Sequence, residues 1–235
     1  MTARIQVLHP IGTSLYNDYT VELLGPLSAP SVEIEVTNLE GLSDEPFVFS
    51  PDSVHNELVA ALKTAERDGV AGVVVACASD PGIEAASGEV SIPVVGPFGA
   101  LASLGHATGR LGIIAAGYKI ETWKPRAVAH GLGDSLVSVR KSDFSHPDKD
   151  LSNELLARDP QLLLDHILDE MRRSIVEEAV TQATEAALVD GVDTIFFACT
   201  LWSGLLEPVR AAVPNVKVLD PLVSPVRYLE YLLGV

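Results

Sequence analysis

The chain has 235 residues, 47% of them hydrophobic and 20% charged, which suffices for one large or two small domains with a substantial core. The 16 basic and 32 acidic residues leave a formal net charge of -16, which argues against a nucleic-acid partner because phosphate binding needs clustered Lys and Arg. No uninterrupted apolar run reaches about 18 residues, so we expect no membrane association. The mean hydropathy of +0.27 indicates a large core, with room for a buried contact between copies in a homo-oligomer.

The opening segment, MTARIQVLHP, lacks the long apolar region and the cleavage site that are typical of a signal peptide. Two cysteines without such a signal are expected to be reduced thiols in a cytoplasmic protein. The chain has neither a C-x-x-C pair nor a glycine-rich phosphate loop. We therefore expect no metal site and no organic cofactor.

Short β-branched apolar segments alternate with segments of helical period along the whole chain. Eight strands are predicted, at 4–9, 32–39, 70–76, 92–96, 110–116, 135–140, 193–198 and 216–220. Several are apolar nearly throughout, as expected of parallel strands that are covered on both faces. The alternation predicts an α/β fold with doubly wound parallel sheets and right-handed crossovers.

Two predicted helices have clear start and stop signals. The segment 50–69 begins Ser-Pro-Asp, an N-cap followed by a proline at the first helical position, and ends at a glycine suited to a left-handed cap. The segment 159–191 begins Asp-Pro and ends Asp-Gly, and at about 30 residues it is long enough to be kinked or split. The polar segment 141–159 before it is expected to be a loop and is a candidate lid.

The chain contains an internal repeat of three segments in the same order. They align without gaps as AERDGVAGVVVAC (65–77) with ALVDGVDTIFFAC (187–199), IPVVGPFGA (92–100) with VKVLDPLVS (216–224), and ARIQVLHP (3–10) with GRLGIIAA (109–116). Three matches in order indicate two halves with a common plan. We expect two pseudo-symmetric flavodoxin-like lobes with parallel sheets and a cleft between them.

The predicted lobes are residues 1–105, with Cys77, and 106–235, with Cys199. The C-terminal segment 215–235 is a candidate for packing back on the first lobe. Both cysteines fall just past the carboxyl end of a buried strand, where open α/β sheets bind ligands. If the halves face each other, the two thiols border one cleft from opposite sides.

Two opposed thiols suit proton transfer at carbon. A thiolate on one face of a carbon acid removes a proton, and a thiol on the other face returns one, so that a centre α to a carbonyl is inverted without a cofactor. Backbone N–H groups at the turns after each cysteine would stabilise the developing oxyanion and lower the thiol pKa. A single cysteine at a strand end is more often a small buried hydrophobe, whereas two at equivalent sites favour a functional role.

The loops at the predicted ligand end supply candidates for substrate contact. These are Thr13, Ser14, Ala78, Ser79, Gly117, Tyr118 and Thr200. Thr13 and Ser14 are equally suited to N-capping the first helix. Asp80 suits either a turn or the orientation of a ligand, and His9 is expected to be a neutral loop residue. We interpret Asp68 and Asp190, which match in the repeat, as turn residues.

Several of these segments resemble the aspartate/glutamate/hydantoin racemase superfamily, and within it the hydantoin and allantoin racemases. They are CASDPGIEAA (77–86), the strand ending at Cys199-Thr200, and the succession of strand, helix, Gly-Leu and Val-Arg in 103–143. The resemblance spans most of the chain. It implies a two-lobed α/β fold and cofactor-independent racemisation or epimerisation of an amino acid, hydantoin or allantoin-like substrate that carries a carbonyl or carboxylate. It also implies that Cys77 and Cys199 are the two bases.

Two loops depart from the family pattern. His9–Ser14 lacks the Asn-containing or acidic motif, and Ala115-Ala116-Gly117 replaces the usual hydroxyl residues. Maleate isomerase and arylmalonate decarboxylase activities are therefore alternatives within the superfamily, although two retained cysteines weigh against the single-cysteine decarboxylase. The alternative from another class is a non-catalytic small-molecule binding protein, which has no need of a thiol on each wall.

Overall fold

The computed structural model describes residues 2–42, 51–115, 120–143 and 147–235. All eight predicted strands are present: β1 (Ala3–His9), β2 (Val32–Asn38), β3 (Gly72–Val75), β4 (Val94–Val95), β5 (Leu111–Ala115), β6 (Leu136–Lys141), β7 (Thr194–Phe197) and β8 (Lys217–Leu219). They form two four-stranded sheets in the orders β2-β1-β3-β4 and β6-β5-β7-β8. Every pairing is parallel, which confirms the predicted α/β class.

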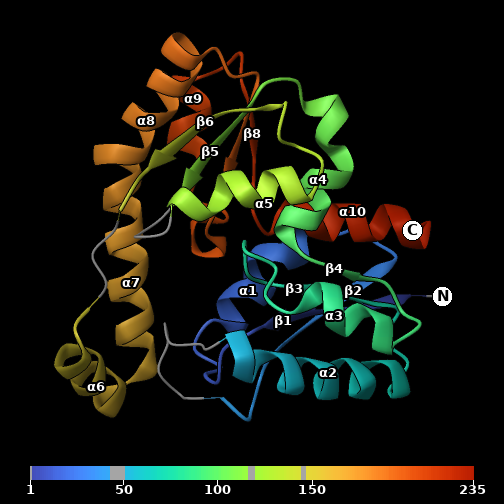
Figure 1. Cartoon of the computed structure of the whole chain (residues 1–235). Coiled ribbons are helices and arrows are strands. Elements are labelled where there is room, and N and C mark those ends of the chain that lie inside the picture. Colours follow the sequence, from blue (N-terminus) through green and yellow to red (C-terminus); the bar gives the residue numbers. More distant parts are fainter. Residues whose placement is uncertain (1, 43–50, 116–119, 144–146) are drawn as a thin grey trace. The chain divides into compact units, whose positions relative to one another are not determined.

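Helices flank both sheets (Figure 1). The α-helices are α1 (Asn17–Leu24), α2 (Pro51–Arg67), α3 (Ile83–Ala86), α4 (Pro97–Thr108), α5 (Trp123–Ala129), α6 (Lys149–Arg158), α7 (Pro160–Ser174), α8 (Val180–Glu185), α9 (Glu207–Ala212) and α10 (Val223–Leu233). Short 3-10 turns are η1 (Gly25–Leu27), η2 (Ser87–Glu89), η3 (Ile120–Thr122) and η6 (Thr200–Trp202). The π-helical turns are η4 (Ile175–Ala179) and η5 (Ala186–Asp190).

The chain divides into two compact units, and the C-terminus belongs to the first. The first unit is Met1–Ala100 with Leu222–Val235, and the second is Leu101–Pro221. Helix α10, red in Figure 1, packs against β3 of the first unit. Its Leu229 approaches so closely that a Cβ placed at Gly72 would lie 2.8 Å from Leu229 Cδ1.

In the first unit the alternation of side chains along β1 and β3 fills two cores, one on each face of the sheet. One core joins Ile5, Val7, Val74 and Ala76 to α1 and α10, through Leu24, Val226 and Leu229. The other joins Leu8, Val73 and Val75 to α2, through Val54, Leu58 and Leu62. The first unit is therefore a three-layer sandwich.

The second unit has the same central pair of strands, β5 and β7, which are buried along their whole length. Helix α7 buries one face and packs against η6, where the Trp202 ring meets Phe197 edge-on at 5.3 Å between centroids. Helices α8 and α9 pack against each other in the same unit.

The two units repeat each other in detail. Ala71 donates to the Arg4 carbonyl at 2.8 Å, and Asp193 donates to the Arg110 carbonyl at 2.8 Å. Each arginine also donates a guanidinium N–H to the last carbonyls of the helix before the next strand, that of Asp68 or that of Asp190. Orphan carbonyls at two helix ends are thus satisfied by matched arginines.

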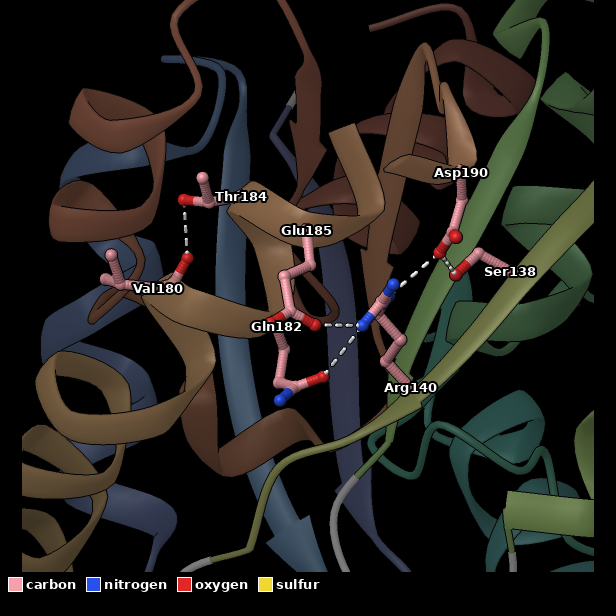
Figure 2. Close-up of polar contacts among 7 residues, drawn as sticks. All are labelled: Ser138, Arg140, Val180, Gln182, Thr184, Glu185 and Asp190. Atoms are coloured by element: carbon pink, nitrogen blue, oxygen red, sulfur yellow. Dashed lines mark hydrogen bonds and ion pairs between the residues drawn. The ribbon is translucent and has the colours of Figure 1, made fainter. Parts of the chain in front are cut away.

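Strand β6 lies at the edge of its sheet and is tied to the long helical run. Figure 2 shows the Arg140 side chain extending from β6 to Gln182, Glu185 and Asp190. The hydrogen bond from Arg140 and a second from Ser138, at 2.6 Å, hold the pKa of Asp190 below its ordinary value. Asp190, interpreted above as a turn residue, therefore also anchors a strand, whereas the Asp68 side chain is 59% exposed.

The long predicted helix is present but not uniform. The helical run from Pro160 to Asp190 contains the two π turns, and it ends at Gly191, whose φ of 67° is left-handed. Within it Thr184 donates its hydroxyl to the Val180 carbonyl at 2.8 Å, a contact typical of bent helices (Figure 2).

The predicted loop over 141–159 is wrong for most of its length, because Lys149–Arg158 forms α6. The Asp148 carboxylate caps this helix by accepting the N–H of Leu151 at 2.8 Å. Asp159 ends α6 and caps α7, so the two helices follow each other without a linker. By contrast, α2 begins and ends within the predicted 50–69, although Ser50 lies outside the described residues.

Candidate active site

Two short segments, called the cysteine turns below, follow the equivalent strands β3 and β7. They are residues 77–82 in the first unit and 199–204 in the second. Neither thiol is part of a disulfide, and both are partly buried. Ala76 donates to the Leu8 carbonyl and Ala198 to the Ile114 carbonyl, each at 2.8 Å, so each turn leaves its sheet at the same point.

The first cysteine turn places a hydroxyl beside its thiol. Cys77 Sγ lies 3.4 Å from the Ser79 Oγ, a hydrogen-bonding distance for sulfur. The Cys77 carbonyl accepts the N–H of Asp80 at 2.9 Å, which closes the turn. Asp80 and Gly82 both have left-handed backbones, with φ of 48° and 72°. Aspartate tolerates this conformation better than most residues.

The Asp80 carboxylate is engaged by the start of α4. It accepts the N–H of Phe98 at 3.1 Å and that of Gly99 at 2.6 Å. These donors belong to the first turn of the helix, where a negative charge is stabilising. Asp80 is therefore held by its own unit, which favours the turn role among the two roles that the sequence left open.

The second cysteine turn has a different course. Cys199 has an extended backbone and precedes η6, and its carbonyl accepts the N–H of Trp202 at 3.2 Å. Ser203, fully buried, donates its hydroxyl to Asp220, which also accepts the N–H of Gly204 at 2.9 Å. Asp220 and Ser203 are not among the predicted site residues. The Asp-Pro dipeptide after the strand at 216–220, matched to Gly96-Pro97, was the available signal.

The loop after β1 follows a strand adjacent to β3, so it lies at the same edge of the sheet as the first cysteine turn. It carries Thr13 and Ser14, but neither caps α1, because the N-cap is Tyr16 and has no side-chain cap. Thr13 Oγ1 instead accepts the N–H of Leu15 at 3.2 Å. The capping role considered for these residues is wrong, since the chain makes a further turn before the helix begins.

His9 ends β1 and is buried, with Nε2 2.9 Å from the Thr20 Oγ1. Burial lowers the pKa of His9 from its ordinary value of 6.5 to about 4. The imidazole is therefore neutral near pH 7, as predicted, but it is a buried strand residue rather than the loop residue that was expected.

The structure distributes the predicted site residues over two sheet edges. The first unit holds Thr13, Ser14, Cys77, Ala78 and Ser79, with the Ala78 side chain buried, and the second holds Cys199 and Thr200. The predictions at 117 and 118 lie outside the described residues. Within the described ranges, no group of three or more His, Cys, Asp or Glu side chains is arranged to hold a metal ion. Among the helices in those ranges, none is long and apolar enough to span a membrane.

Comparison with known proteins gives a consistent set of relatives. The family model of the Asp/Glu/hydantoin racemases matches residues 5–229. A hydantoin racemase from Rhizobium meliloti is 27% identical over 177 residues, which cover 75% of this chain and 66% of that protein.

Solved structures of racemases share the fold. An allantoin racemase from Klebsiella pneumoniae superposes with a TM-score of 0.75 at 19% identity, over 99% of this chain and 88% of its own. The allantoin racemase of Pseudomonas fluorescens gives a TM-score of 0.68 at 20% identity, over 98% and 91%. With a family model matched along nearly its whole length, the chain belongs to the Asp/Glu/hydantoin racemase family, a family of isomerases.

Proposed function

We propose that this protein is a cofactor-independent racemase or epimerase that inverts a carbon α to a carbonyl, with Cys77 and Cys199 as the two bases. The observation that carries the proposal is the placement of one partly buried thiol, outside any disulfide, just past each of the equivalent strands β3 and β7. Family membership supports the reaction class, and it agrees with the names of the hydantoin and allantoin racemases among the relatives.

In the proposed reaction one cysteine, as thiolate, removes the α-proton from one face of the substrate. The electron pair of the broken C–H bond is delocalised onto the carbonyl oxygen. The other cysteine, as thiol, then delivers its proton to the opposite face, so the centre is inverted and the protonation states of the two cysteines are exchanged. The reverse reaction starts from that exchanged state, and each thiol serves one enantiomer.

We assign substrate contact to the residues around the two cysteines. They are Thr13, Ser14, Ala78, Ser79, Gly117, Tyr118 and Thr200. Hydroxyl and backbone N–H donors at these positions suit a carboxylate or an enolate oxygen. The substrate is accordingly a small carbon acid such as an amino acid, a hydantoin or an allantoin-like compound. We further propose that the enzyme works in the cytoplasm as a homo-oligomer.

The test is a polarimetric screen of single enantiomers of amino acids, hydantoins and allantoin. The wild-type chain should racemise at least one of them, and should keep its activity after exhaustive dialysis against EDTA. Cys77→Ser and Cys199→Ser should each abolish inversion. Because the only cysteines are these two, the double variant is the matched blank.

Other outcomes point to the alternatives. Proton NMR of maleate or of an arylmalonate, neither of which is chiral, identifies double-bond isomerisation or decarboxylation by the appearance of a new product. Ligand binding with no turnover of any substrate, together with slow and equal alkylation of both thiols, would indicate a binding protein and contradict the proposal.

A further inference from the structure

Each cysteine turn is linked to the loop after the neighbouring strand by one carboxylate. In the first unit the link is Asp80, which accepts the N–H groups of Phe98 and Gly99 at 3.1 and 2.6 Å, just after β4. In the second unit it is Asp220, just after β8, which accepts the Gly204 N–H at 2.9 Å and the Ser203 hydroxyl. In each unit, therefore, a carboxylate joins the cysteine turn to the loop after the neighbouring strand.

The loop that supplies the carboxylate differs between the units: it is the cysteine turn in the first unit and the loop after the neighbouring strand in the second. The repeat aligns Asp220 with Gly96, and the offset of its cysteine-containing segment, continued for three more residues, aligns Asp80 with Trp202. Gly96 lacks a side chain where the second unit has its carboxylate, and a Cβ placed there would collide with the Asp80 Oδ1. The two units thus keep the link while using residues that are not equivalent, which indicates that the link itself is required rather than either residue alone.

We propose that Asp80 and Asp220 are positioning residues that fix the thiols of Cys77 and Cys199 for proton transfer. Their route to each thiol is short. The Asp80 N–H closes the turn on the Cys77 carbonyl at 2.9 Å. Ser203 and Gly204 follow η6, whose Trp202 donates to the Cys199 carbonyl at 3.2 Å. Charge-assisted hydrogen bonds hold such turns more firmly than neutral ones.

The catalytic part of this inference rests on the proposed function, since it requires the thiols to be bases. A displacement of about 1 Å at a reacting group costs about 100-fold in rate. Loss of a carboxylate should therefore lower kcat much more than it raises KM. The local part concerns only how firmly each thiol is held, and it is measurable without a substrate.

Replacement by asparagine distinguishes the two links. A carboxylate accepts two N–H donors at once, but an asparagine has one acceptor and turns its NH2 group toward the second donor. Asp80 faces two backbone N–H groups, so Asp80→Asn should behave like Asp80→Ala. Asp220 faces one N–H and the Ser203 hydroxyl, which can rotate and accept from the NH2 group. Asp220→Asn should therefore retain the link that Asp220→Ala loses.

The experiment measures iodoacetamide alkylation of each cysteine in the full chain, resolved by peptide mass spectrometry. Asp80→Ala and Asp80→Asn should speed the labelling of Cys77 about 10-fold, because the freed turn opens more often, and leave Cys199 within about twofold. Asp220→Ala should speed the labelling of Cys199 alone by a similar factor, and Asp220→Asn should label both cysteines at rates near those of the wild type. The matched controls are Asp68→Ala and Asp134→Ala, exposed turn positions of the two units, which should change neither thiol.

With the racemised substrate from the screen, the three link-breaking variants should lose about 100-fold in kcat with KM within about threefold. Unchanged Cys77 labelling in folded Asp80→Ala, or equal acceleration of both thiols by one substitution, would overturn the inference. If an alanine variant does not fold, Asp80→Asn replaces Asp80→Ala and Ser203→Ala replaces Asp220→Ala in the comparison of labelling rates. If the variants show the expected labelling pattern but the wild-type chain racemises none of the substrates, the proposed function is rejected and the links remain established.

Discussion

At the scale of single residues, the proposed chemistry depends on two thiols and on the groups that surround them. Ser79 Oγ lies 3.4 Å from the Cys77 Sγ, and at the same spacing after Cys199 the second turn has Leu201, which carries no hydroxyl. The two turns are thus equivalent in position but differ in the groups beside the thiol. Such a difference suits the proposed two-base reaction, in which each thiol serves one enantiomer.

The single-cysteine variants should separate inversion from proton exchange. Cys77→Ser and Cys199→Ser each leave one thiolate, which can remove the proton from its own enantiomer and return one to the same face. In deuterated water, NMR should show loss of the α-proton without racemisation, from opposite enantiomers in the two variants. The double variant is the control. Near wild-type racemisation by either single variant would refute the assignment of that cysteine.

His9 should make stability depend on pH. The pKa of His9 is about 4 in the folded chain and about 6.5 in the unfolded chain. Between pH 4 and pH 6.5 the His9 side chain is therefore protonated in the unfolded state and neutral in the folded state. Stability is therefore full above pH 6.5 and falls as the pH drops toward 4. Between pH 7 and pH 5 the His9 contribution amounts to a loss of about 2 kcal/mol.

Urea unfolding of His9→Gln at the two pH values measures this contribution. Glutamine places its amide where Nε2 meets the Thr20 hydroxyl, but it does not titrate. The variant should lose about 2 kcal/mol less than the wild type on acidification, and the partly exposed His166→Gln should match the wild type. An equal loss in His9→Gln and wild type would show that His9 is not the titrating group.

At the scale of elements, the edge strand β6 is held by a side chain rather than by a second strand. Arg140 joins it to Asp190 at 2.8 Å, and the two side chains are only 19% and 25% exposed. Arg140→Ala should lower the free energy of unfolding by about 1–3 kcal/mol, because the Asp190 charge loses its cationic partner and keeps the Ser138 hydroxyl as a donor. Chemical denaturation measures the change.

The control is Arg172→Ala, which removes an exposed ion pair with Asp169 and should cost at most about 0.5 kcal/mol. Asp190→Asn should recover part of the loss in the Arg140→Ala background, because it removes the unpaired charge while its amide oxygen can still accept the Ser138 hydroxyl. Equal effects of the Arg140 and Arg172 substitutions would mean that β6 does not depend on this network.

The same scale shows what the sequence predicts and what it does not. All eight strands were predicted, and the inner strands β3, β5 and β7 have the clearest signal, because parallel strands buried on both faces are apolar nearly throughout. Helix α6 was missed because its polar composition hides the capping contact of Asp148 with Leu151. The links of Asp80 and Asp220 were missed for another reason: they join loops 18 and 16 residues apart, and no local pattern encodes such a contact.

At the scale of the whole molecule, the last helix completes the first unit. Leu222, Val226 and Leu229 of the C-terminal segment lie in the core with Ile5, Val7 and Val74, so the chain returns to its beginning after building the second unit. The two tryptophans, Trp123 and Trp202, both belong to the second unit, and the two thiols lie one in each. Fluorescence and the labelling of Cys199 therefore report on the second unit, whereas the labelling of Cys77 reports on the first.

This arrangement gives a prediction for Leu229→Ala. The side chain is fully buried against β3, where Gly72 leaves room for it, so its truncation should cost about 2–5 kcal/mol. In mild urea Cys77 should be alkylated faster than in the wild type, whereas the labelling of Cys199 and the tryptophan fluorescence transition should stay unchanged. Leu232→Ala on the same helix, at a side chain 48% exposed, is the control and should alter neither thiol. Faster labelling of Cys199 in Leu229→Ala would show instead that α10 stabilises both units, because a cavity beside β3 can expose the second thiol only if the stability of the second unit also depends on this helix.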